Sequence, residues 1–186
     1  MNHNQIFIAV VVIWVASEIG VAIAKRSRGG ASRKDRGSLT LLWIAITIAA
    51  FAGGTIASSV RIARMPREAF WIGIALIILG IIVRAIAIVT LWRYFTVAVE
   101  IATGHELIER GMYRVIRHPS YTGLLLSFLG LGFAFRNWIS LAVVMTVTFL
   151  ALSYRVRVEE AALIEHFGDR YREYMKRTKR FIPGLL

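Results

Sequence analysis

Residues Phe70 to Leu91 read FWIGIALIILGIIVRAIAIVTL, an apolar run of 22 residues that contains a single charge, Arg84. A helix needs about 20 consecutive apolar residues to cross the hydrocarbon core of a bilayer. This stretch therefore predicts a transmembrane helix, and it sets the class of the whole protein.

Similar apolar runs lie on both sides of this stretch. Gln5–Ala24 and Leu39–Val60 precede it, and Tyr121–Phe135 and Trp138–Tyr154 follow it. No Lys or Arg precedes the first run, so we expect a span there rather than a cleaved signal peptide. The last two runs are short, and they predict either a hairpin that crosses the membrane and returns or a buried re-entrant hairpin. The expected fold class is an all-α, polytopic membrane protein of about five transmembrane helices.

The composition agrees with this class and excludes several others. The chain is 57% hydrophobic and 18% charged, with a mean hydropathy of +0.62, which excludes intrinsic disorder. It has no cysteine, which excludes a disulfide scaffold, a zinc–cysteine site and a thiol nucleophile.

The net charge of +12 is unevenly placed along the chain. Of the 23 Lys and Arg residues, 18 fall in segments 25–38, 92–120 and 155–186, which five spans would put on one side of the membrane. By the positive-inside rule, we expect the N-terminus outside and these segments, with the C-terminus, in the cytosol. The excess charge then serves topology and lipid contact, and we expect no nucleic-acid partner.

Two charges, Glu18 and Arg84, lie inside predicted spans, each six or seven residues from the inner end. Charges at such depth pair or face a polar cavity, so we expect them to pair or to line one pocket. The alternative is that Arg84 extends to the interface. Ala49, Gly53 and Ala57 in the second span favour close helix packing, mainly within the chain; the same pattern would suit an oligomer, which nothing else in the sequence supports.

The composition changes after the third span and divides the chain into two regions. Residues 1–92 hold three spans and the basic loop 25–38, and residues 93–186 hold the polar motifs. Within the second region, Thr103–Gly123 reads TGHELIERGMYRVIRHPSYTG. The tail predicts a helix that continues from the last span to a break at Gly168.

Several kinds of site are poorly supported by these motifs. A metal site needs three or four converging ligands, and the candidates lack HExxH-type spacing: His105, His118, Glu159 and Glu160. Ser120 beside His118 indicates a hydrolase only weakly, because no GxSxG is present. No GxGxxG follows a strand, which excludes a Rossmann nucleotide site. The rings, histidines and mixed charges suit a zwitterionic, aromatic cofactor, although a polar cap with interfacial tyrosines is the simpler explanation.

Two motifs resemble those of the isoprenylcysteine carboxyl methyltransferase family. The first runs from His105 to Gly123 and contains the sequence RHPSYTG, and the second comprises Arg155, Glu159, Glu160, Leu163, Phe167, Gly168, Tyr171, Tyr174 and Pro183. The family consists of integral membrane enzymes that use S-adenosylmethionine. The resemblance implies a cofactor pocket enclosed by a cytosolic loop and the C-terminal helix, with a groove between helices for a lipid-tailed substrate.

The resemblance also implies site residues, position by position. Cofactor contacts fall on His105, Glu106, Leu107, Ile108, Tyr113, His118, Pro119, Ser120, Tyr121 and Glu159. Arg155 falls where the family contacts the substrate, so Arg155, as a substrate-positioning residue, and Glu159 are the expected catalytic pair, and no metal is expected. The chain departs from the family at Ala98, where eukaryotic members have Gln, and its glutamate run has two residues rather than about four. The contact made by that Gln is therefore missing or comes from elsewhere.

Physical chemistry is consistent with these implied roles. Tyrosine and histidine rings can pack against adenine and bond to its edge or to the ribose. Glu159 can pair with the ammonium group of the cofactor, and Arg155, one helical turn away, can hold a substrate carboxylate. For Arg155, an interfacial arginine that contacts lipid phosphate is the alternative.

The implied function is methyl transfer from S-adenosylmethionine to the carboxylate of an isoprenylcysteine or a similar lipophilic acceptor. A carboxylate is ionised at neutral pH, so no general base is required and catalysis rests on positioning and water exclusion. Related membrane methyltransferases act on phospholipid amines or small thiols, and a thiol would need activation by His118 or His105. NADPH-dependent sterol reductases share the Arg-His-Pro-x-Tyr-x-Gly pattern but tend to carry Arg-Asp-Glu where this chain has Glu159 and Glu160. A membrane scaffold without enzymatic activity is the last alternative.

Overall fold

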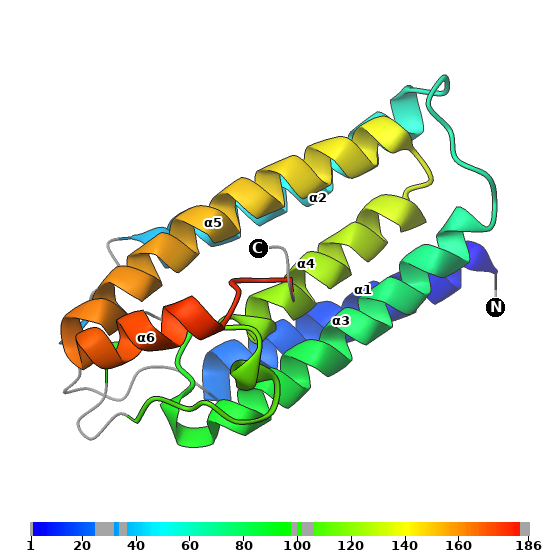
Figure 1. Ribbon diagram of the computed structural model, residues 1–186. Helices are drawn as coiled ribbons and strands as arrows, with labels where there is room; N and C mark the ends of the chain where they lie inside the picture. The colour runs from blue at the N-terminus through cyan, green and yellow to red at the C-terminus, as the bar shows by residue number, and fades with distance from the viewer. Residues whose placement is uncertain (1, 25–31, 34–36, 98–99, 102–105, 183–186) are drawn as a thin grey trace.

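The computed structural model describes residues 2–24, 32–33, 37–97, 100–101 and 106–182, and its helices form one elongated bundle (Figure 1). The α-helices of the described residues are α1 (His3–Ala24), α2 (Ser38–Ser59), α3 (Ala69–Leu91), α4 (Pro119–Ala134), α5 (Trp138–Phe167) and α6 (Asp169–Arg177). Short 3₁₀ turns occur at η1 (Trp92–Tyr94) and η2 (Gly111–Arg114). Two-residue strands, β1 (Ser32–Arg33) and β2 (Glu100–Ile101), pair antiparallel beside the helices.

Four of these helices, α1, α2, α3 and α5, are long and apolar enough to cross a membrane. Helix α4 has 16 residues, which gives it a length of about 24 Å, less than the bilayer core. The predicted spans agree with the helices to within two residues at most ends. The last one is longer, because α5 continues without a break from the apolar run to Phe167, as the predicted tail helix required.

The helices pack in the order α2, α5, α4, α3 and α1 across the bundle (Figure 1). Helix α3 lies against both α1 and α4, and α5 lies against α2 and α4. Helix α6 lies at one end of the bundle, opposite the start of α1 (Figure 1). The buried core between the helices is apolar and includes Trp14, Leu42, Ile77, Phe128 and Leu152.

Helices α3 and α4 approach each other so closely that the glycines on their shared face have no room for a side chain. A Cβ added to Gly80 would lie 2.5 Å from the carbonyl oxygen of Gly123, and one added to Gly130 would lie 2.5 Å from that of Gly73. On each helix the two glycines are seven residues apart and so lie on one face. Contact of this kind is how small residues bring membrane helices together.

The small residues of α2 are used within the chain. Ala49 and Gly53 are buried, and a Cβ on Gly53 would lie 2.6 Å from Val144 on α5. The Ser140 hydroxyl donates to the Gly53 carbonyl oxygen at 2.8 Å, which fixes the contact between α2 and α5. The face that would have suited an oligomer is therefore an intramolecular interface at these positions.

Candidate active site

A cavity of about 860 Å³, including its open mouth, lies at the end of the bundle where α6 packs. It is enclosed by the segment after α3, the beginning of α4, the last turns of α5 and helix α6. The residues that line it are Leu91, Tyr94, Phe95, Thr96, Glu106, Leu107, Ile108, Tyr113, Arg117, His118, Ser120, Tyr121, Arg155, Glu159, Ala162, Leu163, Phe167, Tyr171 and Tyr174.

Most of the site residues predicted from the sequence meet at this cavity. Those among its lining residues are Glu106, Leu107, Ile108, Tyr113, His118, Ser120, Tyr121, Arg155 and Glu159. Pro119 is buried as the first residue of α4 and is not among them. Proline at this position begins a helix, because its missing N–H would have no partner there. His105 and the departing position Ala98, like Pro183, lie outside the described residues.

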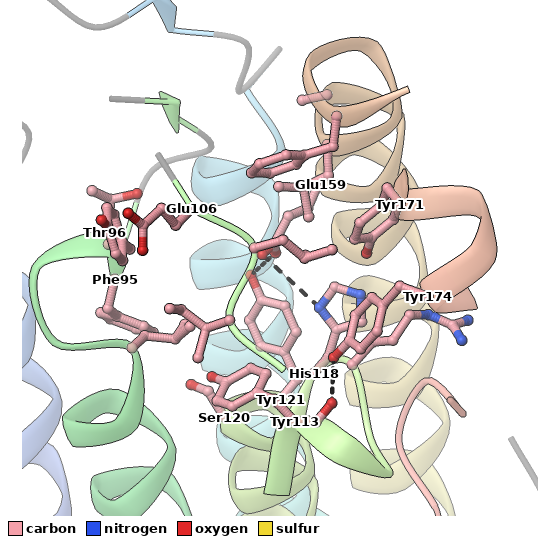
Figure 2. A pocket seen from close by; sticks show the side chains of 18 of the residues that line it. Phe95, Thr96, Glu106, Tyr113, His118, Ser120, Tyr121, Glu159, Tyr171 and Tyr174 are labelled. Atoms are coloured by element: carbon pink, nitrogen blue, oxygen red, sulfur yellow. Dashed lines mark hydrogen bonds and ion pairs between the residues drawn. The ribbon is translucent and has the colours of Figure 1, made fainter. Parts of the chain in front are cut away.

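The turn at Gly168 between α5 and α6 brings α6 against the rest of the cavity wall. Gly168, at φ +58°, ends α5 and turns the chain into α6, which folds Tyr171 and Tyr174 back toward the cavity. Figure 2 shows Glu159, Tyr171 and Tyr174 facing Phe95 and other residues of the segment after α3. A glycine suits this turn because positive φ is strained for other residues.

Glu159, Tyr121 and Arg155 form a connected polar chain in the cavity wall, and Figure 2 shows the part between Tyr121 and Glu159. The Tyr121 hydroxyl donates to Glu159 Oε2 at 2.8 Å and accepts from Arg155 Nε at 3.3 Å. Glu159 and Arg155 lie one turn apart on α5, and Tyr121 comes from the first turn of α4. The predicted catalytic pair is thus joined by a residue of the other predicted motif.

The Arg155 guanidinium is 1% exposed and is already engaged by protein groups. Besides Tyr121, it donates from Nη1 to Ser38 Oγ at 2.5 Å and from Nη2 to the Val97 carbonyl oxygen at 2.6 Å. This geometry excludes the simple interfacial arginine that contacts lipid phosphate. A substrate carboxylate bound by Arg155 would have to replace the Ser38 hydroxyl or the Val97 carbonyl.

His118 is buried between two glutamates of α5, Glu159 and Glu160. Its Nδ1 lies 3.9 Å from Glu159 Oε1 and its Nε2 lies 3.4 Å from Glu160 Oε1. Its ring stacks on that of Tyr121, with 5.7 Å between the ring centroids. The imidazole is therefore packed against Tyr121 and lies between two carboxylates.

Two arginines, Arg117 and Arg180, bind the carboxylate of Glu160 and form a clamp on it. None of these three residues was predicted as part of the site. The Glu160 carboxylate accepts from Arg117 Nε at 3.0 Å and from Arg180 Nη2 at 2.7 Å. Backbone bonds run beside this clamp, from Arg117 N to Lys179 O at 2.7 Å and from His118 N to Arg180 O at 3.1 Å. The segment after α6 thus closes against the strand of chain that carries His118.

Three buried tyrosines remain neutral around the cavity. Burial is the largest cause that raises the pKa of Tyr113, Tyr171 and Tyr174 far above the ordinary value of a phenol. The Tyr174 hydroxyl donates to the Tyr113 carbonyl oxygen at 2.7 Å, which ties α6 to η2. In the described part of the chain, no three His, Cys, Asp or Glu side chains gather as metal ligands.

A second, smaller cavity adjoins the first and extends between the helices. Phe95, Thr96, Tyr121 and Arg155 line both cavities. The remaining wall of the second one comes mainly from the spans and consists of Glu18, Leu39, Leu42, Trp43, Ile46, Arg84, Val97 and Leu124. The two cavities therefore share a wall that contains the guanidinium of Arg155 and the phenol of Tyr121.

Comparison with known proteins shows which family has a matching sequence. Residues 71–165, just over half of the chain and most of the cavity wall, match the isoprenylcysteine carboxyl methyltransferase (ICMT) family. The chain belongs to this family. It is also an integral, multi-pass membrane protein, as the four long apolar helices indicate.

Similar proteins cover part of the chain. Protein-S-isoprenylcysteine O-methyltransferase B of Arabidopsis thaliana is 35% identical over 122 residues, which are 63% of this chain and 62% of the relative. A probable protein-S-isoprenylcysteine O-methyltransferase of Oryza sativa subsp. indica is 32% identical over 117 residues, 62% of this chain and 61% of the relative. This chain therefore spans about three fifths of the length of these plant relatives.

A solved structure supports the fold. It is the eukaryotic intramembrane Ras methyltransferase ICMT, which matches with a TM-score of 0.59 and 23% identity over 78% of this chain and 52% of that one. The cavity residues that sequence reasoning missed include Arg117, Tyr171 and Tyr174. All three lie within or beside the two family motifs, so the signal for them was present.

Proposed function

We propose that this protein is an S-adenosylmethionine-dependent methyltransferase that transfers a methyl group to the carboxylate of an isoprenylcysteine or a similar lipophilic acceptor. The observation that carries the proposal is the meeting of Glu159, Tyr121 and Arg155 where the larger cavity adjoins a cavity between membrane helices. A charged cofactor and a lipophilic acceptor need such neighbouring sites.

The residues of the larger cavity fit S-adenosylmethionine. Tyr113, Tyr121 and His118 offer rings and polar edges for adenine and ribose, and Glu159 offers a carboxylate for the ammonium group. When bound there, this cofactor would supply an electrophilic methyl group on a sulfonium, leaving S-adenosylhomocysteine after the carboxylate oxygen has formed the new bond to carbon. Glu159 is held in place for this contact by the hydroxyl of Tyr121.

Arg155 would orient the acceptor, which enters from the second cavity. An ionised carboxylate needs no base, so the contribution of the protein is positioning and exclusion of water. If the acceptor replaced the Ser38 hydroxyl or the Val97 carbonyl, its carboxylate would take over the hydrogen bond that Arg155 now donates to that group. The apolar wall of α2, with Leu42, Trp43 and Ile46, would accommodate the lipid part.

The division of the chain is also part of the proposal. Of the residues that line the larger cavity, Leu91 alone belongs to the region 1–92, and the others belong to the region 93–186, which we propose as the catalytic region.

We further propose that the N-terminus lies outside and that the cavity opens to the cytosol, because of the distribution of Lys and Arg. Since the chain has no cysteine, single cysteines at Arg64 and at Glu173 should react with an impermeant reagent from opposite sides. Labelling of both from the same side would contradict this orientation.

Calorimetric titration with S-adenosylhomocysteine and, separately, with NADPH tests the cofactor. We expect S-adenosylhomocysteine to bind and NADPH not to bind. Binding of NADPH alone would overturn the proposal in favour of a reductase, and binding of neither would favour a scaffold. Transfer of a tritiated methyl group to farnesylcysteine analogues, compared with lipid extracts and small thiols, then tests the acceptor.

A further inference from the structure

An ion pair inside the membrane part of the bundle connects three helices. Glu18 on α1 and Arg84 on α3 face each other, with Arg84 Nε 2.6 Å from Glu18 Oε1 and Arg84 Nη2 donating to Glu18 Oε2 at 2.8 Å. The two side chains are only 9% and 11% exposed. The pairing expected from their equal depth in the sequence is therefore confirmed, and Arg84 does not simply extend to the interface.

Arg84 of this ion pair also bonds to a third residue, Ser120. The remaining terminal nitrogen of the guanidinium, Nη1 of Arg84, donates to Ser120 Oγ at 2.7 Å and to the Ser120 carbonyl oxygen at 3.3 Å. Ser120 lies in the first turn of α4 and lines the larger cavity, next to Tyr121. Glu18 and Arg84 line the second cavity instead. One guanidinium therefore joins the walls of both cavities.

Glu18 orients the guanidinium of Arg84 toward Ser120. One of its carboxylate oxygens accepts from Arg84 Nη2 and the other lies 2.6 Å from Arg84 Nε, so both oxygens face the guanidinium. Glu18 also cancels the charge of Arg84 beside the N-terminus of α4, where a positive charge alone is unfavourable. Without Glu18, Arg84 would be a single charge in an apolar surrounding and would seek another partner or the interface.

We propose that Glu18 is a positioning residue for the cofactor cavity, which acts through Arg84 on Ser120. The inference rests on the proposed function, because it takes S-adenosylmethionine as the occupant of the larger cavity. It brings the first helix into the site, although α1 contributes no residue to the wall of that cavity among the described residues. Glu18 touches neither Ser120 nor the cofactor cavity, so its effect on affinity must pass through Arg84.

A double-mutant cycle on cofactor affinity tests this path. Glu18→Gln, Ser120→Ala and the double variant are titrated with S-adenosylhomocysteine in detergent. Loss of one charge-assisted bond in the path should raise Kd by about tenfold in each single variant, and the double variant should be no weaker than Ser120→Ala alone. Affinity of Glu18→Gln equal to that of the unmodified protein, or fully additive losses, would overturn the inference. A purely structural pair would lower the unfolding temperature without this non-additivity.

Two further variants guard the interpretation. If Glu18→Gln does not fold, the charge-neutral double variant Glu18→Gln/Arg84→Gln removes the buried lone charge and should still bind about tenfold more weakly. Ser17→Ala is the matched control on α1, because the Ser17 hydroxyl bonds to Trp14 within its own helix, and its affinity should be unchanged. If the unmodified protein does not bind S-adenosylhomocysteine, the proposed function fails, and if it binds with no coupling between Glu18 and Ser120, this inference alone fails.

Discussion

Replacement of Tyr121 by phenylalanine removes one oxygen atom and tests how the cavity holds its glutamate. That oxygen donates to Glu159 Oε2 at 2.8 Å and accepts from Arg155 Nε at 3.3 Å. A hydrogen bond to a charged group contributes about 1.5–3 kcal/mol, and the longer contact to Arg155 contributes less. We therefore expect Tyr121→Phe to lower the free energy of unfolding by about 2 kcal/mol.

The same substitution should weaken cofactor binding. Glu159 would lose the bond that orients its carboxylate, and Kd for S-adenosylhomocysteine should rise by about tenfold in calorimetric titration. Tyr154→Phe is the matched control, since Tyr154 on α5 is 42% exposed and lines neither cavity. If Tyr121→Phe binds within about twofold of Tyr154→Phe, the hydroxyl does not position Glu159 and the reasoning is wrong.

Three other predictions concern stability and are read from unfolding in detergent. Gly80→Ala should destabilise the bundle by about 2 kcal/mol, because the new Cβ would lie 2.5 Å from the Gly123 carbonyl oxygen, whereas Gly20→Ala has open space and should be neutral or stabilising. Glu160→Gln should lower the unfolding free energy by about 3 kcal/mol, since it breaks a buried pair, while Glu173→Gln, whose pair is exposed, should leave the midpoint unchanged. Tyr174 has a raised pKa in the folded state, so the folded protein keeps a proton that the unfolded chain releases near pH 10. Stability should thus be full below about pH 10 and fall above it, and a Tyr174→Phe variant should lose part of this alkaline dependence. The same unfolding midpoint for Gly80→Ala and Gly20→Ala would contradict the first prediction, and the same midpoint for Glu160→Gln and Glu173→Gln would contradict the second. The same unfolding midpoint of the unmodified protein at pH 9 and at pH 11 would contradict the third.

The helices could be predicted because hydropathy alone determines where a chain can cross a bilayer. The run Phe70–Leu91 became α3 with one additional residue at its start. The start of α4 was predicted two residues late, at Tyr121, because the apolar run begins there whereas the helix begins at Pro119. Proline at the first helical position supplied a signal that hydropathy does not contain.

The partners of the site residues could not be predicted in the same way. Arg155 bonds to Ser38, which is 117 positions away, and no periodicity links the two. The same holds for the clamp of Arg117 and Arg180 on Glu160. The pairing of Glu18 with Arg84 was the exception and could be predicted. Two charges at the same depth in the bilayer can meet even when their spans are far apart in the sequence.

The contact between the segment after α6 and the chain before α4 has a consequence for the order of synthesis. Val115, Arg117 and His118 make backbone bonds to Lys179 and Arg180, more than 60 residues later in the chain. Because a nascent chain emerges from its N-terminus, every apolar helix can enter the bilayer before this contact exists. This contact therefore forms only after translation has passed residue 180, and a growing chain stalled earlier would be inserted in the membrane with its cavity incomplete.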